Sequence, residues 1–129
     1  MDSGGLILGC VVTPANVGDR EGARLLLHLG YAAWPRLSHI WADGNYGGPL
    51  VQEVKNVYGF DLEIVNKPKE QKGFSKGFSV LARRWVVERT FAWLGKCRRL
   101  SKDYEQRPCM ERAFINVAMT SLMLRRLAK

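Results

Sequence analysis

Cysteine, histidine and long apolar runs are all scarce in this sequence of 129 residues. The three cysteines, Cys10, Cys97 and Cys109, are widely spaced and include no CxxC pair, which argues against a disulfide framework or a zinc site. The apolar runs are too short or too interrupted to cross a bilayer, and Met1 to Gly5 is not the cationic start of a secretory signal. We therefore expect a cytoplasmic protein that has no membrane partner.

The two histidines, His28 and His39, both lie within predicted secondary-structure elements. No serine or cysteine occurs in the context of a nucleophile elbow. A lone histidine of this kind is usually a packing or surface residue. The sequence therefore does not favour a hydrolase that uses a nucleophile and a histidine base.

Acidic residues are also in deficit, with 12 Asp and Glu against 20 Lys and Arg, so the net charge is +8. This balance favours nucleic acid or an anionic surface as the partner, and composition alone does not choose between them. The length suits a single domain over residues 1–129, and a hydrophobic content of 47% is enough to build a core.

The apolar pattern predicts strands and helices in alternation. Short apolar or alternating runs indicate strands, and apolar residues at helical spacing indicate helices. The predicted order is a strand over 5–13, a helix over 20–29 with Asp19 as N-cap, a strand over 37–42, a helix over 49–58, a strand over 60–65, a loop over 66–78, a helix over 83–100 and a last helix from Pro108. About three strands and four helices in this order indicate an α/β fold.

In the helix over 83–100, Glu88 is a single carboxylate among seven cations between positions 83 and 102. A helical projection separates it from a broad apolar arc made by Val86, Val87, Thr90, Phe91, Trp93, Leu94 and Cys97. Glu88 then has two interpretations. It pairs with Arg84 one turn earlier on a solvated face, or it holds a divalent metal beside a polyanion whose phosphates the arginines contact.

Asp43 follows the strand over 37–42 and opens the Gly-rich run Asp43-Gly44-Asn45-Tyr46-Gly47-Gly48. One interpretation is an ordinary turn residue that bonds its own backbone. The other is a functional group at the carboxyl end of a strand, where the sites of open α/β sheets gather. If Asp43 and Glu88 meet, a pair of divalent metals held between them would support in-line attack on a phosphodiester.

The loop over 66–78 is basic, and Phe74 and Phe78 alternate with its lysines. It is either a solvated loop or a flap that contacts phosphate while its aromatic rings pack on bases or on the domain.

Three segments carry a resemblance to a known family. They are residues 41–46 (Trp-Ala-Asp-Gly-Asn-Tyr), 84–94 (Arg-Trp-Val-Val-Glu-Arg-Thr-Phe-Ala-Trp-Leu) and 97–105 (Cys-Arg-Arg-Leu-Ser-Lys-Asp-Tyr-Glu). Together with residues 12–17 and 19–23, they resemble the DDE transposases of bacterial insertion sequences, of the IS4/IS5 type. The second segment is long and specific, whereas Asp-Gly-x-Tyr alone is a weak signal.

The resemblance implies a ribonuclease-H-like fold that cleaves and joins DNA strands with Mg²⁺ or Mn²⁺. It matches Asp43 to the second catalytic Asp of the family, Glu88 to its third acid and Arg84 to its signature Arg, so Asp43 and Glu88 would be the metal ligands. The implied partner is the double-stranded DNA of the transposon ends, in the cytoplasm of a bacterium. The cations expected to contact this DNA are Arg84, Arg89, Lys96, Arg98, Arg99, Lys102, Lys69, Lys72 and Lys76.

The sequence departs from the family at its start, because the family's first catalytic Asp lies upstream of the segment that matches Met1 to Gly5. We therefore expect an N-terminally truncated catalytic domain that is inactive alone and that forms a homo-oligomer or associates with full-length transposase. The alternative is a non-catalytic remnant that binds DNA or associates with transposase. A third and more distant interpretation is an RNA-binding protein of ribosomal type.

Overall fold

The structure is a computed structural model that describes residues 1–65 and 82–128. Within these residues the chain forms four α-helices, as the sequence predicts, and two strands where three were expected. In chain order they are α1 (Asp19–Gly30), β1 (His39–Ala42), α2 (Pro49–Tyr58), β2 (Asp61–Ile64), α3 (Ala82–Gly95) and α4 (Pro108–Leu127), with 3₁₀ turns η1 (Tyr31–Ala33), η2 (Gly44–Tyr46) and η3 (Arg98–Leu100). This content confirms the α/β class, and the predicted loop over 66–78 lies outside the described residues.

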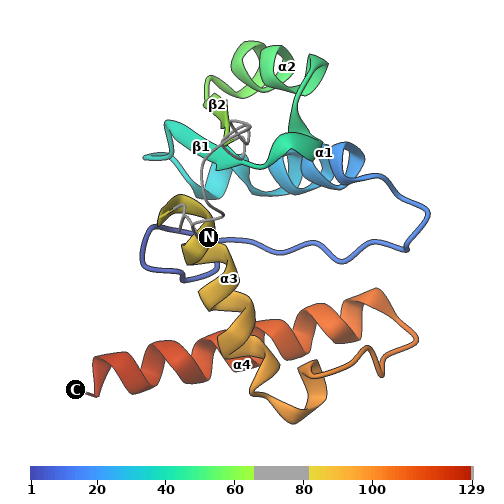
Figure 1. The fold of residues 1–129 in the computed structure, drawn as a ribbon, viewed down its shortest axis with the longest axis vertical. Coiled ribbons are helices and arrows are strands. Elements are labelled where there is room, and N and C mark those ends of the chain that lie inside the picture. The colour runs from blue at the N-terminus through green and yellow to red at the C-terminus, as the bar shows by residue number, and fades with distance from the viewer. Residues whose placement is uncertain (66–81, 129) are drawn as a thin grey trace, which may run out of the picture.

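β1 and β2 form a parallel pair, with residues 39–42 opposite residues 61–64. Parallel strands need a crossover connection, and α2 provides it. The buried core around this strand pair is formed by Leu27 of α1, Leu50 and Val54 of α2, and Phe60, which directly precedes β2. Figure 1 shows α1, α2 and the two strands gathered at one end of the molecule and α4 at the other, with α3 between them.

Local sequence signals set the ends of α2, which match the prediction. Pro49 lies in the first turn, where its missing N–H costs no helical hydrogen bond. Gly59 ends the helix in the left-handed conformation, with φ 74°, and donates its N–H to the Lys55 carbonyl. In α1, by contrast, the N-cap is Gly18, which makes no side-chain cap, so the prediction of Asp19 as the N-cap was wrong.

The strand predicted over residues 5–13 was also wrong. The Leu6 N–H donates to the Asp2 carboxylate, and the Leu6 carbonyl accepts the Asp2 N–H, so the first residues close a turn. Further along, the backbone passes close to an indole, since a Cβ atom at Gly9 would lie 2.5 Å from the Trp34 ring. Contacts of this kind with residues distant in sequence, rather than hydrogen bonds to a neighbouring strand, hold the segment in position.

Only part of the apolar arc predicted for α3 is buried. Thr90 is fully buried and Leu94 is 9% exposed, whereas Phe91 is 62% exposed. The helix ends at Gly95, and the residues predicted to continue it form η3. A helix buries the stripe that faces its neighbours, and here that stripe runs through Thr90 and Leu94.

Thr90 joins α3 to the start of the chain. Its hydroxyl lies 2.8 Å from the carbonyl oxygen of Gly5, 85 residues away in sequence, and 2.9 Å from that of Val86, one turn earlier in α3. The helix already supplies the Val86 carbonyl with a backbone donor, so the single hydroxyl proton serves Gly5. Beside it, Arg89 donates to the Gly4 carbonyl at 3.1 Å, and Arg126 of α4 reaches the same oxygen at 3.4 Å. A buried carbonyl requires a donor, so Thr90 is the buried anchor of the N-terminal turn, and the two arginines support it from outside.

We expect Thr90→Val to lower the free energy of unfolding by about 1–3 kcal/mol, because valine keeps the shape of the side chain but leaves the Gly5 carbonyl buried without its donor. Urea unfolding measures the change. Ser101→Ala is a surface control, since it removes an exposed hydroxyl that bonds the Arg98 carbonyl, and it should cost less than about 0.5 kcal/mol. Equal losses in the two variants would contradict the anchoring role.

Candidate active site

Asp43 lies directly after β1 and precedes η2. Its Oδ1 accepts the backbone N–H of Asn45 at 3.0 Å, which is the bond that the turn interpretation predicts. The carboxylate is exposed, and its Oδ2 has no hydrogen-bond partner within residues 1–65 and 82–128. The turn thus fixes one carboxylate oxygen at the carboxyl end of a parallel strand and leaves the other available to a ligand.

Two residues from the start of α1 contact this turn. Asp19 Oδ2 accepts the side-chain N–H of Asn45 at 2.9 Å, and Arg20 donates to the Asn45 carbonyl at 3.1 Å. Burial raises the pKa of Tyr46 in the same turn, and the negative charges of Asp19 and Asp43 raise it further. The sequence interpretation missed this role of Asp19, because a turn motif gives no signal of a partner 26 residues away.

A bidentate ion pair fixes α1 against α2. Arg24 Nε and Nη2 donate to the carboxylate of Glu53 at 2.8–3.0 Å. These hydrogen bonds hold the pKa of Glu53 below its usual value, although partial desolvation opposes the shift. The pair sets the relation between the helix that carries Asp19 and the helix that follows the Asp43 turn.

Glu63 of β2 joins two aromatic residues of β1 on one face of the sheet. Its Oε2 lies 3.0 Å from His39 Nε2 and accepts the indole N–H of Trp41 at 2.9 Å. The rings of His39 and Trp41 lie 4.7 Å apart between centroids. The sequence interpretation treated His39 as a packing or surface residue and did not single out Glu63, although the alternation of β2 predicts that it faces away from Leu62.

Glu88 lies on the exposed side of α3. It makes no ion pair with Arg84 in the described part of the chain, so the ordinary helix pair is not formed. α3 packs mainly on α4 and η3, whereas the strand that leads to Asp43 packs beside α2. The two carboxylates are therefore carried by different groups of elements.

The donor atoms suit a hard divalent cation in kind but do not form a cluster. Mg²⁺ and Mn²⁺ prefer carboxylate oxygens, and Mg²⁺ is often held by one or two carboxylates together with water and phosphate. Asp43 and Glu88 are exposed residues of this type. Among the residues that the structure describes, no group of three His, Cys, Asp or Glu side chains could hold a metal ion.

Two of the cations predicted to contact DNA are engaged within the protein. The Arg89 guanidinium lies 4.9 Å from the centroid of the Trp93 ring, and its buried Nε has no hydrogen-bond partner among the described residues. Arg99 pairs with Glu105 at 2.8 Å and lies over the ring of Phe114. Charge along the sequence does not reveal which cations pack on aromatic rings, so these contacts were not predicted.

The remaining predicted cations divide into two groups. Lys96, Arg98 and Lys102 are exposed, Arg84 is half-buried, and none of the four forms an ion pair with a described residue. Lys69, Lys72 and Lys76 lie outside the described residues. Their roles stay predictions.

Comparison with known proteins identifies the family. The sequence profile of the transposase DDE domain matches residues 1–123. The chain belongs to the transposase DDE domain family. A protein of Burkholderia cepacia, named as a candidate transposase for insertion sequence element IS402, is 29% identical over 123 residues, which cover 90% of this chain and 56% of that protein. No solved structure matches the chain.

This family confirms the resemblance to DDE transposases. The chain spans about half (56%) of the length of its Burkholderia relative. Among the described residues, no helix is both long enough and apolar enough to cross a membrane.

The Arg24–Glu53 pair predicts how stability depends on pH. We expect Glu53→Gln to unfold at a lower urea concentration than the wild type at pH 7. The folded-state pKa of Glu53 lies below its unfolded value, so its contribution is present above the unfolded pKa and is lost as the pH falls through the folded pKa. The difference between the two proteins should therefore shrink as the pH falls below the ordinary pKa of a glutamate, which is about 4.3.

Urea midpoints measured across this pH range test the prediction. Glu21→Gln is the matched control, because Glu21 makes only one longer contact with Arg24, at 3.2 Å, and is more exposed. A difference between wild type and Glu53→Gln that stays constant as the pH falls would contradict it.

Proposed function

We propose that this chain is the C-terminal part of a ribonuclease-H-like transposase catalytic domain of the IS4/IS5 type, which acts in the bacterial cytoplasm on the double-stranded DNA of transposon ends. In this proposal Asp43 and Glu88 are the two metal-holding carboxylates that the chain contributes. The family match carries the proposal, because it extends over residues 1–123 and so includes both carboxylates.

The local geometry of each carboxylate is compatible with this role. Asp43 is fixed by its bond to the Asn45 N–H and keeps one oxygen without a partner among the described residues. Glu88 is exposed and is not paired with Arg84. An exposed carboxylate without an ion pair can approach a cation without first breaking another contact.

A bound Mg²⁺ or Mn²⁺ would supply electrostatic stabilisation of the charge that develops on the phosphodiester. The residues of the chain would position the ion and the DNA backbone. Asp43 and Glu88 would hold the ion. The arginine one turn before Glu88, Arg84, would neutralise a backbone phosphate together with Lys96, which directly follows α3.

We also propose that the chain alone does not cleave DNA, since its two carboxylates form an incomplete set of acidic ligands. In the part of the chain that the structure describes, no three acidic, histidine or cysteine side chains are grouped so that they could hold a metal ion. The same observation favours the second candidate function, a non-catalytic module that binds DNA or associates with transposase.

A nicking assay tests whether the isolated chain is inactive. With Mn²⁺ and supercoiled DNA, we expect the wild-type chain to leave as little nicked product as Glu88→Gln. Asp103→Asn is the control, because Asp103 only bonds a backbone N–H within its own loop. Nicking that Glu88→Gln abolishes and Asp103→Asn retains would contradict inactivity of the isolated chain and would make it an enzyme by itself.

Metal binding gives a readout that does not depend on activity. We expect calorimetric titration with Mn²⁺ in the presence of DNA to give an affinity at least about tenfold weaker for Asp43→Asn and for Glu88→Gln than for the wild type, because each variant removes a charged oxygen ligand. The same affinity in Asp43→Asn, Glu88→Gln and Asp103→Asn would contradict the assignment of the ligands.

Phosphate contact predicts a salt-dependent affinity for DNA. We expect the double variant Lys96→Ala, Lys102→Ala to bind duplex DNA more weakly and to reduce the slope of log K against log salt by about 1.8, since each lost phosphate contact removes about 0.9. Lys55→Ala is the control, because Lys55 pairs with Asp61 on α2 and β2. An affinity that does not fall with salt, or an equal change in slope for Lys55→Ala, would contradict the assigned surface.

A further inference from the structure

The turn that follows β1 holds both the backbone and the side chain of Asp43. Just before it, the Ala42 carbonyl accepts the Val65 N–H at 2.7 Å, at the end of the parallel strand pair. The Asp43 carboxylate then accepts the Asn45 N–H at 3.0 Å. The strand pair therefore places the residue, and Asn45 orients its carboxylate.

Asn45 is itself held at two points by the first residues of α1. Its side-chain amide donates to the Asp19 carboxylate at 2.9 Å, and its carbonyl accepts the Nε–H of Arg20 at 3.1 Å. The short helix η2, which contains Asn45, lies against α1 (Figure 1). Both polar ends of Asn45 are thus fixed by residues 25 and 26 positions earlier in the chain.

The Asp19 carboxylate is available for this contact because it does not cap α1. An acidic or hydroxyl side chain at a helix start commonly accepts one of the free backbone N–H groups there. In α1 the N-cap is Gly18, and no side chain makes this bond. The hydrogen bond of Asp19 instead joins α1 to the turn after β1.

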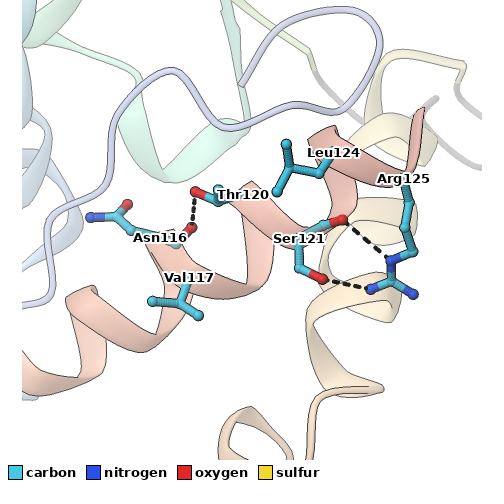
Figure 2. Close-up of a pocket in the computed structure, with 6 residues that line it drawn as sticks. All are labelled: Asn116, Val117, Thr120, Ser121, Leu124 and Arg125. Carbon is cyan, nitrogen blue, oxygen red and sulfur yellow. Dashed lines mark hydrogen bonds between the residues drawn. The ribbon is translucent and has the colours of Figure 1, made fainter. Parts of the chain in front are cut away.

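A hollow on α4 provides a contrast. Figure 2 shows its lining, which comes from one helix: Asn116, Val117, Thr120, Ser121, Leu124 and Arg125. The hydrogen bonds drawn there join residues four positions apart, Thr120 to Asn116 and Arg125 to Ser121. Such bonds stay within one helix, whereas the bonds of Asn45 link two elements of the fold.

We propose that Asp19 is a positioning residue for Asp43: by holding Asn45, it keeps the Asp43 carboxylate in the orientation that binds the divalent cation. This rests on the proposed function, in which Asp43 is a metal-holding carboxylate. An oxygen that is already oriented loses less conformational freedom when it binds a cation. Direct hydrogen-bond partners of metal ligands change the metal affinity by about 10- to 100-fold. Asp19 acts one residue further out, so its effect is smaller.

Charge is the alternative explanation. Burial raises the pKa of Tyr46, and the negative charges of Asp19 and Asp43 raise it further, so both carboxylates lie near this ring. Two carboxylates attract a cation more strongly than one, whatever their hydrogen bonds. The explanations separate in Asp19→Asn, which loses the charge but keeps an acceptor oxygen for Asn45.

Calorimetric titration of the whole chain with Mn²⁺, in the presence of duplex DNA, measures the effect. We expect Asp19→Ala to weaken the affinity by about three- to tenfold. Asp19→Asn should restore it to within about twofold of the wild type, because the acceptor is back in place. Asn45→Ala should match Asp19→Ala, and the double variant should be no weaker than either, because the two residues act through one bond.

Glu21→Gln is the matched control. It removes a carboxylate from the same first turn of α1, so any effect of charge on the helix itself is shared with the Asp19 variants. Glu21 pairs with Arg24 at 3.2 Å. We expect this variant to keep the wild-type affinity for Mn²⁺.

Hydrogen exchange of the Asn45 backbone amide, followed by NMR without metal, gives a second readout. This N–H donates to Asp43, so a looser turn opens it to exchange. We expect exchange at least about twofold faster in Asp19→Ala than in the wild type, and unchanged in Asp19→Asn and Glu21→Gln.

Three results would overturn the proposal. The first is a loss of affinity in Asp43→Asn together with wild-type affinity in Asp19→Ala, which would keep the proposed function and remove the positioning role. The second is an equal loss in Asp19→Asn and Asp19→Ala, which would assign the effect to charge. The third is an Asn45 amide that exchanges at the wild-type rate in Asp19→Ala. Wild-type affinity in Asp43→Asn would instead contradict the proposed function, and the Asn45 amide would then decide separately whether Asp19 fixes the turn.

Discussion

The hydrogen bond between the Thr90 hydroxyl and the Gly5 carbonyl is the contact on which the position of the N-terminal turn against α3 depends. It is buried, and it ties the N-terminal turn to the middle of α3, two residues after Glu88. The backbone of residue 5 lies close against Thr90, since a Cβ atom at Gly5 would lie 2.7 Å from the Thr90 hydroxyl oxygen. Residue 5 can therefore be only glycine in this arrangement, and α3, the helix that carries Glu88, is tied to the N-terminal turn at this point.

The elements that could be predicted are those whose ends are encoded locally. α2 carries its own proline start and its own glycine stop, and both function as the sequence indicates. The segment over 5–13 has the apolar composition of a strand, but its conformation is decided by Thr90 and Trp34, which are distant in sequence. Strand patterns describe which residues are apolar, and they do not say whether a partner strand is in reach.

The same division holds within the candidate site. The turn bond of Asp43 follows from residues 43–45 alone and was predicted. The contact with Asp19 and the pair between Arg24 and Glu53 join residues 26 and 29 positions apart, so composition and spacing could not reveal them. Among the cations, Arg89 is partly used by an aromatic ring and a carbonyl, whereas Lys96 stays exposed. A count of positive charges therefore overstates the number that are free to meet DNA.

The contact between Arg126 and the Gly4 carbonyl has a consequence for how the protein is made. The two residues are separated by 122 positions, so residue 126 must be synthesised before they can meet. The hydrophobic core shared by α1, β1, α2 and β2 lies within residues 23–62, so it can form during synthesis. The N-terminal turn must wait for α3 and α4, with its glycine carbonyls open to water in the meantime. Docking of this turn is thus a late, long-range closure step, of the kind that slows folding.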